Sequence, residues 1–171
     1  MRSHQMKKIQ ESEAAWNRVR TEAWNPESMD RPPYTGVPRI QLIHRHSFQP
    51  GVFWEVSERA DEWLLYRANV LENRAREPVL VTGYEPLAIS SATLSSYFKR
   101  LTQTSVVIAP YLQSVGGLDG ELFRLVLVGN LFSRVQFDWW SDPPPQWLPI
   151  VEIVNEMLTT FQAATRGDHV A

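Results

Sequence analysis

Three short runs rich in β-branched and aromatic residues follow one another in the first half of this chain, with only a few residues between one run and the next. They cover residues 39–48, 52–57 and 63–71. Such residues favour β-strands. A parallel pair of strands needs a crossover of a dozen residues or more, so these short connectors predict antiparallel neighbours. The chain is thereby restricted to folds built on an antiparallel meander.

A second strand pair is predicted in the sequence LFRLVLVGNLFSRVQFDWW, residues 122–140, where two β-rich segments surround a central Gly-Asn. Gly and Asn readily adopt the positive φ angles that two-residue hairpin turns require. A turn of this type pairs Val128 with Leu131 and, farther along the ribbon, Leu122 with Phe137. In this register one face of the ribbon is largely apolar and the other is mixed.

Two helices are predicted by apolar residues at helical spacing. Residues 90–103 begin with serines suited to N-capping and carry apolar residues at i, i+3, i+4 and i+7 counted from Leu94. The second helix covers residues 149–163, with Pro149 as its first helical residue and one apolar face.

These elements predict an α+β fold with an antiparallel sheet of about five strands, in the order β-β-β-α-β-β-α, and both helices on one sheet face. Residues 78–84 are a candidate for one further short strand, and residues 7–23 for an additional amphipathic helix at the N-terminal end. The predicted organisation is residues 1–38 as N-terminal helix and proline-rich connector, 39–163 as a single α+β domain and 164–171 as a flexible tail.

Composition narrows the class of protein. A chain of 171 residues with 43% apolar residues and a net charge of −2 matches one globular domain. Basic and acidic residues are interspersed, so we expect neither a nucleic-acid nor a membrane partner. The lack of cysteine excludes disulfides, thiolate metal sites and a cysteine nucleophile. With no apolar stretch of membrane-spanning length, we predict a cytoplasmic protein.

The segment FDWWSDPPPQW, residues 137–147, allows two interpretations. In the structural one, it is a stiff connector that ends a strand and sets the angle of the closing helix, with Trp139 or Trp147 covering the core. In the functional one, Trp140 and Trp147 stay partly exposed and form an aromatic surface for a partner.

The succession GGLDGELFRLVL and FDWWSDPPPQWLPIVEIVNEML resembles a pattern of small bacterial α+β proteins that have no assigned activity. The shared features are a Gly-Leu-Asp-Gly turn, a strand pair, Trp-Trp, Pro-x-x-Trp and a closing helix, over residues 86–162. Domains of this kind occur among immunity proteins that neutralise a toxin partner. By analogy of fold, the resemblance implies a protein-binding role.

Two histidines provide the main candidate for a metal site. His44 and His46 are two residues apart in a predicted strand, so their imidazoles lie on one face at a separation of about 7 Å. Glu55, in the next predicted strand, is the candidate third ligand. The alternatives are partly buried structural histidines and a solvated strand edge.

Other catalytic arrangements find little support in the sequence. Ser47 and His46 are adjacent in a strand and point to opposite faces, and no Gly-x-Ser-x-Gly motif is present. The glycine-rich residues 114–121 lack the Lys-Ser/Thr of a phosphate-binding loop and precede a strand, so they predict a turn. We therefore predict neither catalytic nor cofactor-binding residues.

The favoured function is non-catalytic protein binding, with an immunity-type antitoxin role as its most concrete version. Arginines inside predicted strands, together with the tryptophans, suggest a recognition surface. The candidate partner-binding residues are Trp140, Trp147, Arg134 and Asp138. The alternative is a small metal-dependent enzyme or ligand-binding domain that uses the His44/His46 strand. A third possibility is a homo-oligomer formed through an uncovered sheet face.

Overall fold

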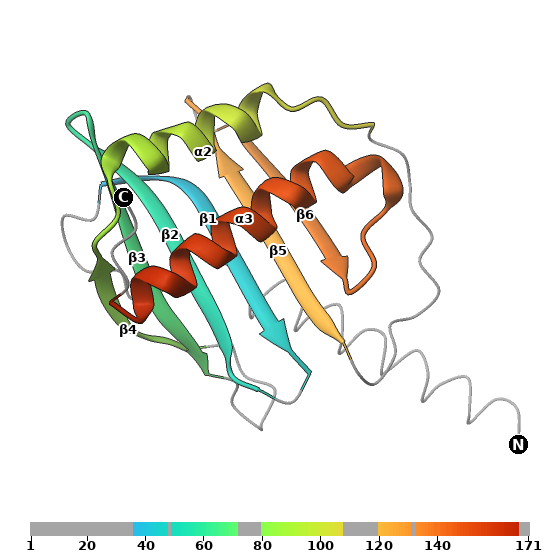
Figure 1. The fold of residues 1–171 in the computed structure, drawn as a ribbon, viewed down its shortest axis with the longest axis horizontal. Helices are drawn as coiled ribbons and strands as arrows, with labels where there is room; N and C mark the ends of the chain where they lie inside the picture. Colours follow the sequence, from blue (N-terminus) through green and yellow to red (C-terminus); the bar gives the residue numbers. More distant parts are fainter. Residues whose placement is uncertain (1–35, 48, 72–79, 108–119, 131–132, 168–171) are drawn as a thin grey trace, which may run out of the picture.

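The computed structural model describes residues 36–47, 49–71, 80–107, 120–130 and 133–167. In these residues six strands form one antiparallel sheet, and two helices cross the same face of it (Figure 1). The strands are β1 (Val37–His46), β2 (Gly51–Arg59), β3 (Glu62–Leu71), β4 (Leu80–Leu87), β5 (Glu121–Val128) and β6 (Arg134–Trp140). The helices are α2 (Ser91–Gln103) and α3 (Leu148–Thr165), and the short 3-10 helix η2 (Pro145–Trp147) precedes α3.

The predicted α+β fold is confirmed, with one strand more than expected. The additional strand is β4, which extends the predicted 78–84 segment to Leu87 and gives the order β-β-β-β-α-β-β-α. The first strand begins at Val37, inside the predicted connector, and α3 continues to Thr165, two residues into the predicted flexible tail. The predicted N-terminal helix, residues 7–23, lies outside the described residues.

The strand order places two segments that are distant in sequence beside each other. Across the sheet the order is β4-β3-β2-β1-β5-β6, with antiparallel pairing throughout. The first three strands form the predicted meander, and β4 extends it by one strand. The chain then passes through α2 and returns to the other side of β1 as β5. Strand β1 therefore lies between β2 and β5. On each face of the sheet, side chains of β1 have neighbours from both of these strands.

The main core lies between the sheet and the two helices, on what we call the helix face. Buried apolar side chains from β1, β2, β3, β5 and β6 meet the apolar sides of α2 and α3 there. The helices are joined by a hydrogen bond of 2.8 Å between the Tyr97 and Thr160 hydroxyl groups. Arg100 also donates two hydrogen bonds, of 2.8 and 2.7 Å, to Glu156. The N-cap of α2 is Ser90, whose side chain accepts from the Thr93 amide, as the serine-rich start predicted.

The opposite face of the sheet, the far face, combines a small apolar cluster with buried polar groups. The cluster contains Ile43, Phe53, Ala68 and Val70. Next to it Glu55 is completely buried. Residues at odd positions in β1 and β2 thus face away from the helices, while those at even positions face them.

The predicted register of the second strand pair is wrong. Leu125 lies opposite Phe137 and Val128 opposite Arg134, a shift of three residues from the two-residue-turn register. An odd shift exchanges the faces of one strand relative to the other. The connection is longer than a two-residue turn, and at its ends the Gly129 amide donates to the Ser133 carbonyl at 2.8 Å. A side chain at position 129 would collide with the Ser133 hydroxyl group, so Gly129 is needed for this close approach.

The tryptophan and proline segment joins β6 to α3. Trp139 is buried on the helix face, and Trp147 is half-buried with its ring edge-on to Phe137 at 5.3 Å. Pro144 immediately precedes η2, which leads directly into α3 at Leu148, one residue before the predicted start. In the structure this segment fastens the closing helix to the sheet, as its structural interpretation requires.

Candidate metal site

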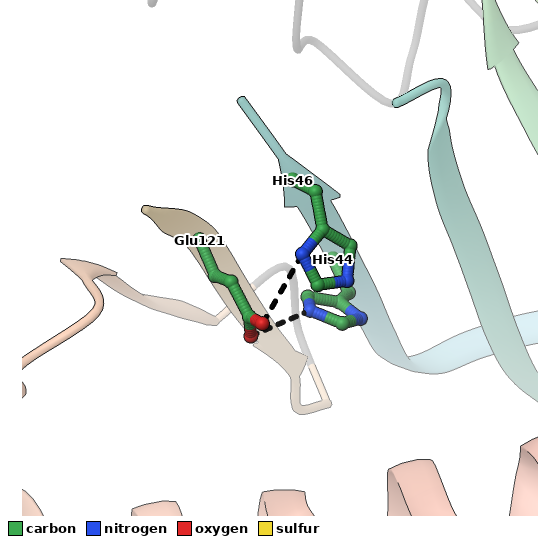
Figure 2. Close-up of side chains that lie close together, drawn as sticks. All are labelled: His44, His46 and Glu121. Atoms are coloured by element: carbon green, nitrogen blue, oxygen red, sulfur yellow. Dashed lines mark hydrogen bonds and ion pairs between the residues drawn. The ribbon is translucent and has the colours of Figure 1, made fainter. Parts of the chain in front are cut away.

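Three chemically active side chains meet on the helix face at one end of the sheet. His44 and His46 end β1, and Glu121 begins β5. The β1–β5 register pairs His46 with Glu121 and His44 with Phe123. Because side chains alternate along a strand, all three side chains project to the same face (Figure 2). We call His44, His46 and Glu121 the triad.

The Glu121 carboxylate lies within bonding distance of both imidazoles. Its Oε2 is 3.0 Å from His44 Nε2, and its Oε1 is 3.1 Å from His46 Nδ1. The dashed lines in Figure 2 mark these two contacts. One ligand atom from each residue of the triad lies within 4.8 Å of the other two. The three groups therefore form one cluster and not two separate pairs.

Aromatic stacking orients His44. Its ring lies nearly parallel to that of Phe123, with centroids 4.7 Å apart and an interplanar angle of 11°. Phe123 stacks in turn on Trp139, with centroids 5.2 Å apart and an angle of 8°. The three rings come from neighbouring strands, β1, β5 and β6. Trp139 of the Trp-Trp pair thus supports the packing that holds a triad imidazole in place.

Hydrogen bonds of the main chain fix the position of Glu121. The Glu121 amide donates to the Ser141 hydroxyl group at 3.0 Å, and the Ser141 amide donates to the Glu121 carbonyl at 2.8 Å. On the other side, both the amide and the hydroxyl group of Ser47 donate to the Gly120 carbonyl at 3.0 Å. The backbone beside His46 and Glu121 is therefore tied together, independently of any contact between their side chains.

Burial adjusts the protonation of His44. The His44 side chain is only 11% exposed, whereas the side chains of His46 and Glu121 are 43% and 40% exposed. Burial lowers the pKa of His44, and this outweighs the hydrogen bond and charge of Glu121, which raise it. His44 is thus held as a neutral imidazole at neutral pH, the form that binds metal ions.

Glu55 is not part of this site. It lies opposite Gln41 in the β1–β2 register and so projects to the far face, away from both histidines. The Gln41 amide group donates to Glu55 Oε2 at 3.0 Å, and the Ser57 hydroxyl group donates to Oε1 at 2.8 Å. The choice of Glu55 as third ligand was wrong because it rested on strand proximity without a register.

A pocket of about 310 Å³ adjoins the two histidines. Its walls come from the end of β1, the β1–β2 turn, β2, β3 and the C-terminal end of α3. Val52 and Trp54 supply apolar surface, and Arg67 and Arg166 supply positive charge. The two histidines of the triad are therefore open to a small molecule on this side.

The four residues predicted to bind a partner do not form one surface. Arg134, Asp138 and Trp140 alternate along the far face of β6, whereas Trp147 packs on the helix face. Asp138 is engaged within the protein, because its Oδ1 accepts from Arg124 Nε at 2.6 Å. Arg134 is exposed and Trp140 is half-buried. Three of the four candidate residues, Arg134, Asp138 and Trp140, therefore share one face of β6.

Sequence reasoning missed Glu121, although it stands at the end of the glycine-rich segment 114–121. Its nearness to His46 depends on the pairing of β5 with β1, and no local sequence pattern predicts that pairing. Comparisons with protein-family models, curated proteins and solved structures return no match for this chain. The resemblance to small bacterial proteins therefore stays a prediction. None of the described helices is both long enough and apolar enough to cross a membrane.

Proposed function

We propose that this protein binds a divalent transition-metal ion through His44, His46 and Glu121. The observation that carries the proposal is the convergence of two imidazole nitrogens and a carboxylate within 4.8 Å on one sheet face. Imidazole and carboxylate suit zinc, iron(II) and manganese(II). Of the alternatives that the sequence left open, this supports the metal-dependent enzyme or ligand-binding domain.

The two Glu121 contacts are close to the spacing of ligand atoms around one metal ion, and a separation of up to 4.8 Å within the triad requires the side chains to close in on the ion. Metal–ligand bonds of about 2.0–2.2 Å place neighbouring ligand atoms about 3 Å apart in octahedral sites and about 3.4 Å apart in tetrahedral sites. The two Glu121 contacts measure 3.0 and 3.1 Å. A metal ion would take the place of the hydrogen bonds between Glu121 and the imidazoles, and the neutral His44 would bind it through Nε2 with its own proton on Nδ1.

Two histidines and one carboxylate leave coordination positions for water or a ligand. This donor set is used by both catalytic zinc and non-haem iron sites. A metal ion held here would act as a Lewis acid toward whatever oxygen donor occupies those positions. The protein's own contribution is to fix His44 by stacking, to fix Glu121 by the Ser141 hydrogen bonds, and to leave a pocket beside them.

The test is the binding of Co²⁺, Zn²⁺ and Mn²⁺ to the metal-free protein, followed by calorimetry and by the absorption spectrum of Co²⁺. We expect one equivalent to bind, with at least a tenfold loss of affinity in Glu121→Gln and in the double variant His44→Ala/His46→Ala. Glu62→Gln, which alters an exposed glutamate paired with Arg59, is the matched control and should bind normally. Equal affinity in the wild-type protein and Glu121→Gln would contradict the proposal.

A protein-binding role is the second candidate, and the edge strand β6 favours it. Strand β6 ends the sheet, and among the described residues no strand pairs with its outer edge. Val135 in this strand is 48% exposed beside exposed Arg134. An exposed edge can accept an added strand from a partner. Full partner binding by a Val135→Lys variant would exclude this edge. The immunity-type role and the cytoplasmic location stay predictions.

A further inference from the structure

The pocket beside the triad is lined by cations and hydrogen-bond donors. Besides the two histidines it contains the guanidinium groups of Arg67 and Arg166 and the side chain of Gln162, and among the described residues no acidic side chain lines it. Arg67 forms an ion pair with Glu85 in which its Nη1 donates at 2.9 Å. A guanidinium group has five N–H donors, so one such bond leaves capacity for a further acceptor. This lining favours an anionic ligand.

The pocket is sized for a small molecule. Its volume of about 310 Å³ lies at the lower end of the range for small-molecule sites, roughly 300–1,000 Å³. Val52 and Trp54 give it an apolar wall. The pocket therefore combines an apolar wall with the polar side chains of Arg67, Arg166 and Gln162.

We infer that the pocket binds a small dicarboxylate that carries a hydroxyl or oxo oxygen next to one carboxylate. This inference rests on the proposed metal site. The carboxylate and the adjacent oxygen chelate the metal ion held by the triad, in the positions that His44, His46 and Glu121 leave open. The second carboxylate lies toward β3 and the C-terminal end of α3, where Arg67 and Arg166 donate hydrogen bonds to it.

Tight binding requires both ends of the ligand, one at the metal ion and one at the arginines. The metal site alone would accept any chelating acid, and the arginines alone would accept any anion. Since both lie around one pocket of limited volume, the ligand with both features gains affinity from a single binding event. Matched acids can separate the two contributions: malate has both features, succinate lacks the hydroxyl group, and lactate lacks the second carboxylate.

The experiment titrates malate, succinate and lactate into the full-length protein loaded with Mn²⁺, with calorimetry as the readout. We expect malate to bind at least tenfold more tightly than the other two acids. Arg67→Gln and Arg166→Gln should reduce malate affinity toward that of lactate and leave Mn²⁺ affinity unchanged. Arg59→Gln, whose ion pair with Glu62 is exposed, is the control. Thermal unfolding checks that Arg67→Gln is folded, and Arg166→Gln tests the same contact at the end of α3.

The possible failures are distinguishable. If Mn²⁺ binds but the three acids bind equally or not at all, the dicarboxylate inference is overturned and the metal site stands. If malate binds equally well to the metal-free protein and to Glu121→Gln, the pocket is an anion site without metal, which also overturns the inference. If no metal ion binds, the proposed function fails, and the inference fails with it.

Discussion

Glu55 and Glu121 occupy comparable places in the sheet but differ in burial and in the groups that their carboxylates contact. They belong to β2 and β5, the two neighbours of β1, and lie opposite Gln41 and His46. Glu55 on the far face is 0% exposed, and its two oxygens accept from an amide and a hydroxyl group. The Glu121 side chain on the helix face is 40% exposed, and its two oxygens approach imidazoles.

The difference shows how the side of a sheet determines what a carboxylate can do. A buried carboxylate is retained only where donors satisfy it, and those donors then fix it in one arrangement. A partly exposed carboxylate beside two imidazoles can coordinate a metal ion together with them, in place of the hydrogen bonds that join the three groups. Glu55 is therefore a structural residue, and Glu121 is the one available to a ligand.

The largest expected effect is on stability, from Glu55→Ala. This change removes the acceptor of both Gln41 and Ser57 and opens a cavity, so we expect the free energy of unfolding to fall by about 3 kcal/mol. Glu121→Ala in the metal-free protein should cost less than about 1 kcal/mol because its side chain reaches solvent. Urea unfolding of both variants measures the contrast, and similar losses would remove the distinction drawn between the two glutamates.

A smaller loss of stability is expected from Gly120→Ala, which perturbs the surroundings of Glu121 and not those of Glu55. An added Cβ would collide with the indole nitrogen of Trp140 and with the Ser141 hydroxyl group. Relief of that collision moves the start of β5, at a cost of about 1–3 kcal/mol. We expect metal affinity to fall in the folded variant as well, by calorimetry. Unchanged affinity would show that Glu121 tolerates displacement.

The smallest effect concerns Glu156, a third glutamate with a charged partner at the surface. The hydrogen bond from Arg100 lowers the pKa of Glu156 below its ordinary value of 4.5. Its contribution to stability is thus present above about pH 4.5 and is lost as the pH falls through the lower folded-state value. Because both side chains are about half exposed, it should not exceed about 1 kcal/mol.

The measurement for Glu156 compares the wild-type protein with Arg100→Gln at pH 7 and at pH 3. The stability difference between the two proteins should be present at pH 7 and should shrink at pH 3. A difference that is the same at both pH values would assign the effect of Arg100 to packing on Tyr97, which its guanidinium group also contacts at 5.7 Å from the ring centroid.

Local sequence pattern was sufficient to predict most of the helices and strands. Helical spacing located α2 and α3, and β-rich runs with short connectors located the β1–β3 meander. These features succeed because each depends on residues that are near one another in sequence. The hairpin register was not predicted at this level: Gly-Asn indicated a turn correctly, but the observed pairing of Val128 with Arg134 leaves a connection longer than two residues.

By itself the sequence determined the α+β class, the helices and the two histidines on one strand face, since backbone periodicity sets which side chains share a face. Only the tertiary structure decided that β5 pairs with β1, which brings Glu121 and not Glu55 to the histidines. The reason is physical: the β1–β5 pairing joins residues 77 positions apart in the His44–Glu121 contact. It forms because α2 and α3 cover one continuous apolar face, and no property of either strand alone specifies it.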